Sequence, residues 1–228
     1  MIVIALAALL GSAPDLGMPA PSPSPSAPAV AEPDWAALIG PPPDEGSAQD
    51  ARDLAALLRL QAARSPADVD RILGEDHPGL DTFAAALGDG FDPARYPLTA
   101  HLLARAGRDL KAVAEPLKAE FGRPRPCLAH PDVIPIGPCH GGGSYPSFHA
   151  ARGALFAALL ADLAPDRAQA IQARGLQLGS DRALGGLHHP SDVRAGQRLG
   201  AAFLPHWLRQ PGPARLLEAA RWHEWQER

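Results

Sequence analysis

Three short segments contain basic residues or histidines that could do chemistry, and each lies where a helix is predicted to begin or end. The first segment, KAEFGRPRP, contains Lys118 and Arg125, and Gly122 with the prolines that follow should end a helix there. An ammonium and a guanidinium that face one pocket suit an oxyanion, because the guanidinium offers a planar fork to its oxygens. Taken alone, the segment could equally be a solvated basic helix end.

The second segment is GGGSYPSFH at 141–149, directly before an apolar helical stretch. Ser147 stands where an N-cap belongs, so the first-turn backbone N–H groups, including that of Phe148, are free to bind an anion. His149 lies in the same turn, close enough to protonate a group that leaves the bound anion. Without the other segments, it would be an ordinary capped helix with a surface histidine.

The third segment, GSDRALGGLHHPSD at 179–192, adds a third cation at Arg182. Pro190 is tolerated in a first helical turn, and His188 and Asp192 are four residues apart on one helix face. The carboxylate can therefore fix the imidazole tautomer and leave the other ring nitrogen free to attack. A zinc site is an alternative without a convincing third ligand, and a plain histidine cluster is another.

Helices must position these segments, because apolar residues recur at intervals of three and four and no long alternating run of Val, Ile or Thr appears. We predict an all-α fold, a single compact helical domain with its active site at helix ends and loops. The predicted helices lie near 48–63, 67–74, 79–88, 97–121, 147–163, 166–180, 190–208 and 212–226. Two long loops, at 122–146 and 179–190, carry much of the chemistry.

The N-terminal part of the 228-residue chain has a different composition. The apolar run at 2–10 is followed by small residues, which predicts a signal peptide at 1–13, although a short buried helix is the alternative. A Pro-, Ala- and Ser-rich stretch at 14–34 is predicted to be a disordered tether before a domain at 35–228. Because a signal peptide directs export, we expect a periplasmic or secreted protein. The apolar run is too short to span a bilayer, so we expect no transmembrane span in the mature chain.

Charge and cysteine content restrict the partners. The chain has 21 Lys and Arg against 25 Asp and Glu, a formal net charge of -4, so no basic field exists to bind a nucleic-acid polymer broadly. Cys127 and Cys139 enclose a short Pro-rich segment, and an exported protein can oxidise them to a disulfide. Two free thiols are the alternative.

The three segments together resemble the motifs of the type 2 phosphatidic acid phosphatase superfamily, and most closely its soluble bacterial branch, the class A non-specific acid phosphatases. The resemblance covers about residues 35–208, and the spacing of the motif residues is intact. Phe148 replaces the family glycine and Asp181 replaces the family serine. The matching residues are Lys118, Arg125 and Pro126, then Pro146, Ser147 and His149, then Arg182, His188 and Asp192.

This resemblance implies a metal-independent acid phosphatase that needs no cofactor and hydrolyses phosphate monoesters through a phosphohistidine. His188, rather than His189, is expected to attack phosphorus, with Asp192 holding it, while His149 protonates the leaving group and later activates water. The phosphate would bind to Lys118, Arg125, Ser147, Arg182 and the backbone at Phe148. Family relatives also imply a homo-oligomer.

Two other functions stay open at this point. A vanadium-dependent haloperoxidase would use the same pocket, and a non-catalytic phosphate-binding relative is suggested by Phe148 and Asp181. We expect the Phe148 ring to project into the substrate cleft, with packing in the core as the alternative. The charge of Asp181 is expected to weaken the grip of Arg182 on phosphate.

Overall fold

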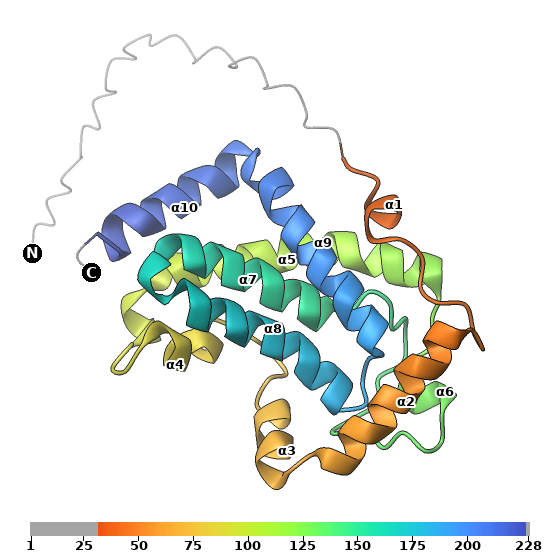
Figure 1. The fold of residues 1–228 in the computed structure, drawn as a ribbon. Helices are drawn as coiled ribbons and strands as arrows, with labels where there is room; N and C mark the ends of the chain where they lie inside the picture. Colours follow the sequence, from red (N-terminus) through yellow and green to blue (C-terminus); the bar gives the residue numbers. More distant parts are fainter. Residues whose placement is uncertain (1–31, 227–228) are drawn as a thin grey trace, which may run out of the picture.

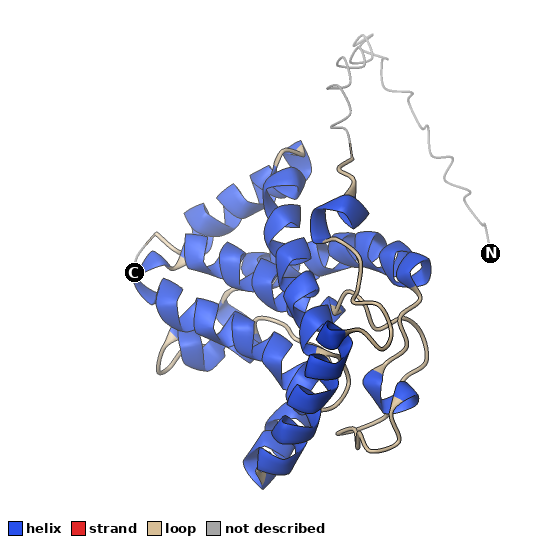
Figure 2. Cartoon of the chain, turned by 45° about the vertical axis from the view of Figure 1, so that its right-hand side comes forward, coloured by secondary structure: helices blue, strands red, loops and turns tan. Residues whose placement is uncertain are grey.

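The structure is a computed structural model of the chain, and it describes residues 32–226. Helices and loops make up this part of the chain, and Figure 2 shows no strand within it. The all-α prediction is therefore confirmed. The predicted signal peptide at 1–13 lies outside the described residues, as does the predicted tether at 14–34 except for residues 32–34.

The helices follow one another along the chain with short connections, except for the long loop that precedes α7 (Figure 1). Their bounds are α1 (Trp35–Ile39), α2 (Ala48–Ala63), α3 (Pro66–Leu73), α4 (Ala84–Leu87), α5 (Pro97–Phe121), α6 (Pro126–Ala129), α7 (Phe148–Leu163), α8 (Ala168–Leu184), α9 (Pro190–Leu208) and α10 (Pro211–Glu224), with 3-10 turns at Asp81–Phe83, Pro93–Arg95 and Pro165–Arg167.

Helix α7 is the centre of the fold. Apolar and small residues occupy nearly all of its faces, which is the pattern of a helix buried on every side. It packs most extensively against α8 and α9, and α5 contacts it as well; Figure 1 shows α7 and α8 side by side with α9 crossing them. The N-terminus of α7, which carries Ser147 and His149, is therefore fixed by packing along the whole helix.

Glycines allow these helices to approach backbone to backbone. A Cβ on Gly153 of α7 would collide with the carbonyl oxygen of Gly175 in α8. On α9, a Cβ on Gly196 would collide with the carbonyl of Ser147, and one on Gly200 with the carbonyl of Ala151. The starts of α7 and α9 are thus held in direct contact.

Helix α5 also packs against α7. Its buried residues recur at helical spacing toward α7 and end with Leu117 and Lys118. Gly122 then adopts a left-handed φ of 58° and its N–H bonds to the carbonyl of Lys118, which closes the helix. Within the loop that follows, Cys127 and Cys139 form a disulfide with Cα atoms 6.2 Å apart.

Several element predictions need correction. The bounds predicted for 97–121 and 190–208 match α5 and α9. The loop predicted at 179–190 is wrong in its first part, because α8 continues to Leu184 and Gly179 packs against Ala150, Gln197 and Val193 instead of breaking the helix. The helix predicted at 79–88 is a 3-10 turn followed by the short α4, and α1 and α6 were not predicted.

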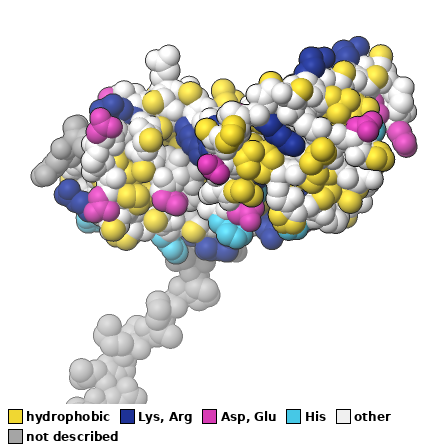
Figure 3. Space-filling model, turned by 90° about the horizontal axis from the view of Figure 1, so that it is seen from below, with side chains coloured by type: hydrophobic (Ala, Val, Ile, Leu, Met, Phe, Trp, Pro, Cys, Tyr) yellow, Lys and Arg dark blue, Asp and Glu magenta, His cyan; other side chains and the backbone are white. Residues whose placement is uncertain are grey.

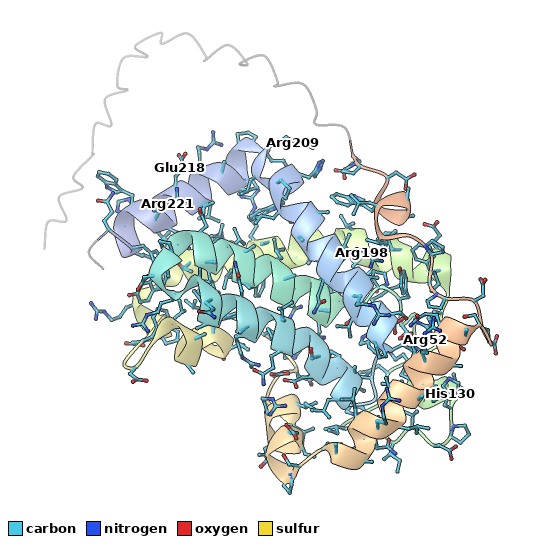
Figure 4. All side chains as sticks on the ribbon, in the orientation of Figure 1. Arg52, His130, Arg198, Arg209, Glu218 and Arg221 are labelled. Carbon is cyan, nitrogen blue, oxygen red and sulfur yellow. A yellow bond between two sulfur atoms is a disulfide. The ribbon has the colours of Figure 1, made fainter. Side chains whose placement is uncertain are left out.

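Between residues 32 and 226, no helix combines the length and apolar character needed to cross a bilayer. Basic and acidic side chains are interspersed on the face shown in Figure 3, without an extended field of one sign. Side-chain contacts also tie the N-terminal elements to the core: Arg198 on α9, labelled in Figure 4, donates to the carbonyl of Ile39 at the end of α1.

Candidate active site

A cavity of about 300 Å³ lies where the end of α5, the start of α7 and the end of α8 meet the residues before α9. The structure brings the three sequence segments together there. The cavity is lined by residues from all three of them, namely Lys118, Arg125, Phe148, His149, Arg182 and His188.

His188 is 3% exposed, and its two ring nitrogens face different groups. Nε2 lies 3.1 Å from Nη1 of Arg125, while Nδ1 lies 3.3 Å from Oγ of Ser144 and 3.6 Å from Oδ2 of Asp192. Because a guanidinium only donates, Nε2 carries the lone pair and Nδ1 carries the proton. Burial, together with the charges of Lys118 and Arg125, lowers the pKa of His188 to about 4, although Asp192 acts in the opposite direction. The lone pair on the cavity side is thus available above that pH.

Asp192 is fully buried and is shared among more partners than the sequence predicted. Its Oδ2 accepts hydrogen bonds from Oγ of Ser144 at 2.5 Å and from the backbone N of His189 at 2.8 Å, and lies 3.1 Å from Nδ1 of His189. Its Oδ1 accepts from Nη1 of Arg123 at 2.7 Å. Burial alone would raise the pKa of Asp192, but hydrogen bonds from the two histidines hold it well below its usual value. The carboxylate is therefore ionised and lies within ion-pair range of Nδ1 of His188, and Oγ of Ser144 contacts both groups.

Three cations from these segments line the cavity beside His188. Nζ of Lys118 donates to the carbonyl of Gly143 at 2.9 Å, and burial, helped by the Arg125 charge, lowers its pKa to about 8. Arg125 donates to the carbonyl of Leu187 at 3.0 Å, and Arg182 pairs with Glu75 at 3.0 Å.

The Nε atoms of Arg125 and Arg182 are buried without a hydrogen-bond partner within the described part of the chain. Buried donors are nearly always satisfied in folded proteins, so free N–H groups at a cavity wall indicate a place for a ligand acceptor.

The N-terminus of α7 completes the polar lining. Oγ of Ser147 caps the helix by accepting from the N–H of Ala150 at 3.4 Å, and the first-turn amides of Phe148 and His149 have no intrahelical acceptor. Nε2 of His149 lies 3.1 Å from the carbonyl of Glu75. Burial lowers the pKa of His149 to about 3, assisted by the positive charges of Arg182 and Arg152. His149 is thus neutral above that pH.

The two departures from the family motif behave differently. Phe148 lines the cavity and also packs against the main core, so both expected positions of its ring are partly met. Asp181 is 2% exposed and does not line the cavity. It is bound by Arg71 through two contacts of 3.0 and 2.9 Å. Arg71 thus pairs with the Asp181 charge and Glu75 pairs with Arg182, while the expected effect of Asp181 on phosphate binding by Arg182 stays a prediction.

Sequence reasoning missed four residues that build the site. Ser144 stands inside the second segment, and Arg123 stands two residues before Arg125, so both were within reach of a search for further polar groups beside the motifs. Arg152 lies one helical turn after His149, and helical spacing could have placed it at the cavity. Glu75 follows α3 in a loop distant from every motif, and no signal in the sequence points to it.

Within residues 32–226, no three or more His, Cys, Asp or Glu side chains are grouped in a way that could hold a metal ion.

Comparisons with known proteins identify the family. The model of the PAP2 superfamily matches residues 99–215, more than half of the chain, and this span contains the three segments. The chain therefore belongs to the PAP2 superfamily. Among curated proteins, it is similar to the acid phosphatase of Zymomonas mobilis subsp. mobilis, with 33% identity over a stretch that covers 69% of this chain and 63% of that protein.

A shorter stretch is 48% identical to the non-specific acid phosphatase of Salmonella typhimurium, covering 26% of this chain and 24% of that protein. The chain thus spans less than two thirds of the length of either relative. Among solved structures, it is similar to a transmembrane PAP2-type phosphatidylglycerolphosphate phosphatase from Bacillus subtilis. The TM-score is 0.54 at 18% identity, over 85% of this chain and 94% of that one, which supports the shared all-α fold.

Proposed function

We propose that this protein is an acid phosphatase that hydrolyses phosphate monoesters through a phosphohistidine on His188, without a metal ion. The observation that carries the proposal is the orientation of His188. Its unprotonated Nε2 faces a cavity with three cations and free N–H donors, while its Nδ1 side faces Ser144 and Asp192. The curated relatives named acid phosphatases support the same reaction class.

In the first step, the Nε2 lone pair of His188 attacks phosphorus, an N–P bond forms, and the P–O bond to the leaving group breaks. Lys118, Arg125 and Arg182, with the amides at the start of α7, would stabilise charge on the phosphoryl oxygens. Such positioned cations and dipoles provide most of the stabilisation in phosphoryl transfer. As His188 gains positive charge, the ionised Asp192 stabilises it, with Ser144 between the two.

His149 is proposed to give a proton to the leaving oxygen in that step and to take one from water in the next. Water then attacks phosphorus, the N–P bond breaks, and inorganic phosphate is released. In the empty site, burial and nearby arginines keep the pKa of His149 at about 3. A bound phosphate brings negative charge that offsets those arginines, so substrate binding should raise the pKa of His149 and allow it to be protonated.

Export to the periplasm or outside the cell is part of the proposal, and the Cys127–Cys139 disulfide supports it, because such bonds persist in oxidising compartments. The homo-oligomer expected from the family resemblance remains a prediction.

The test is release of p-nitrophenol from p-nitrophenyl phosphate by the wild-type protein, by His188→Ala and by His189→Ala. We expect wild-type turnover that continues in EDTA and is inhibited by vanadate. His188→Ala should lower kcat by roughly 10⁴-fold, because it removes the nucleophile, while phosphate binding persists. His189→Ala is the matched control, because His189 also contacts Asp192, and its loss should be much smaller.

Rapid quenching and mass spectrometry should locate the phosphoryl group on His188. Normal turnover by His188→Ala, or a phosphorylated His189, would refute the assignment. Phosphate binding without turnover would indicate the non-catalytic alternative, and halide oxidation with vanadate and peroxide would indicate the haloperoxidase.

A further inference from the structure

Arg152 is a cavity residue for which the proposed reaction has no role. It lies on α7, three residues after His149, and lines the same cavity. Its Nε is buried and has no hydrogen-bond partner, and no carboxylate within the described residues forms a salt bridge with it. Its guanidinium carbon stands 4.5 Å from the centroid of the Phe148 ring.

The other two cavity arginines are anchored by the protein. Arg125 donates to the carbonyl of Leu187, and Arg182 pairs with Glu75. Within the described residues, Nε of Arg152 has no acceptor, and the guanidinium lies over the Phe148 ring. Burial lowers the pKa of Arg152 and so disfavours its charge. A largely buried guanidinium without a counter-charge is costly to the protein alone, and an anion supplied by a ligand would offset that cost.

The position of Arg152 along α7 indicates which part of a ligand it would meet. The reacting phosphate is assigned to the N-terminus of α7, and the leaving oxygen to His149. Three residues of helix advance about 4.5 Å along the axis, so Arg152 stands beyond His149 on the leaving-group side. The Arg152 guanidinium lies over the Phe148 ring, which helps to hold the guanidinium in place. The N–H groups at the edge of the guanidinium can then bond with a ligand.

The rest of the cavity wall on this side is mixed in charge. Exposed Lys111 lines it, but so do the carboxylates of Asp76 and Glu115. These carboxylates offset the charge of Lys111, so Arg152 is the better placed of the two cations to bind a second anionic group.

We propose that Arg152 binds a second anionic group, a carboxylate or a phosphate, on the leaving-group portion of the substrate. The inference rests on the proposed function and names its substrate class: phosphate monoesters whose alcohol carries another anion. Arg152 would select for these substrates because its fork makes two charge-assisted hydrogen bonds to planar oxygens.

The test uses two non-hydrolysable ligands, phenylphosphonate and 3-carboxyphenylphosphonate, so that binding is read by calorimetry whether or not the protein turns over. Wild type should bind the carboxylated ligand at least about tenfold more tightly. Arg152→Gln should abolish this preference and leave the affinity for phenylphosphonate within about twofold. Lys111→Gln is the matched control, since it removes one positive charge from the same cavity, and it should keep the preference.

Three results would overturn the inference: equal affinities of wild type for both ligands, equal weakening of both ligands by Arg152→Gln, or the same loss of preference in Lys111→Gln. Should Arg152→Gln fail to fold, Arg152→Lys keeps the charge without the fork and should show a reduced preference; an unchanged preference would refute the role of the fork. Turnover of phenyl phosphate is measured separately. A protein with the carboxylate preference and no turnover would refute the proposed function and leave the anion site standing.

Discussion

The two regions on either side of Asp192 treat buried arginines in opposite ways. On the side toward α2, Arg123 is bound on all sides by acceptors: Nη1 contacts Ser191 and Asp192, and Nη2 contacts Asp50 and Asp53. On the cavity side, the arginines keep buried N–H groups without acceptors; these residues are Arg125, Arg152 and Arg182. Because Arg182 also pairs with Glu75, charge pairing alone does not separate the two regions; the difference is that, among the described residues, the cavity arginines keep a buried Nε–H without an acceptor, which a ligand could supply.

The sharpest way to break this comparison is to neutralise one arginine from each region. Arg123→Gln leaves the buried carboxylate of Asp192 without its arginine and leaves Asp53 with only the more distant Arg194, so we expect a loss of about 3–5 kcal/mol in the free energy of unfolding. Arg125→Gln should change that free energy by less than about 1 kcal/mol, because no carboxylate depends on it, while lowering kcat/KM by roughly 10²-fold or more.

Urea unfolding and steady-state kinetics on both variants would decide the matter. Equal destabilisation by the two substitutions would show that the distinction between the regions does not hold.

The pH dependence of turnover sharpens the comparison on the cavity side. The pKa of His188 is lowered to about 4, so kcat/KM, which reports the free protein, should fall as the pH drops through about 4 and the nucleophile gains a proton. In the substrate complex, phosphate should raise the pKa of His149 from about 3. The kcat profile should therefore decline as the pH rises through roughly the ordinary imidazole value of about 6.5.

His149→Gln is the control for this profile. It should remove the alkaline decline of kcat and slow alkyl phosphates more than aryl ones, because alkoxides need the proton more. A wild-type kcat that stays constant to pH 8 would argue against His149 as the acid.

A smaller effect is expected from two serines that lie on opposite sides of Asp192. Ser144→Ala removes the hydroxyl between Asp192 and Nδ1 of His188, so kcat should fall by about tenfold with little change in KM. Ser191 instead contacts Arg123 and Asp53. Ser191→Ala should lower the melting temperature and leave kcat within about twofold. If Ser191→Ala lowered kcat while Ser144→Ala lowered only the melting temperature, Ser144 would not be the residue that positions His188.

The parts of the fold and site that could be predicted are those with local signals. Apolar periodicity, with prolines at or near helix ends, predicted α5 and α9. The three motifs together predicted that His149, His188 and Arg182 share one cavity. Gly179 was misread as the start of a loop, because in sequence a glycine that permits close helix packing looks the same as one that ends a helix.

The groups that satisfy the motif residues could not be read from the sequence. Glu75 reaches Arg182 from a loop more than a hundred positions away, and Arg123 joins α2 to Asp192. Such contacts arise from tertiary packing, which leaves no local pattern. A carboxylate four residues from a histidine suggested the pair of Asp192 and His188, which the structure shows at 3.6 Å, but the sequence did not reveal that Ser144 contacts both.

The glycine contacts among α7, α8 and α9 also set limits on how this protein can change. Gly196 and Gly200 hold α9 against the backbone of Ser147 and Ala151, so the separation of His149 from His188 depends on the absence of a side chain at these two glycines. Any larger residue there would move both helix starts and misalign the two histidines. Evolution toward new substrates therefore has freedom at the cavity wall, at Phe148 and Arg152, and almost none along these contacts.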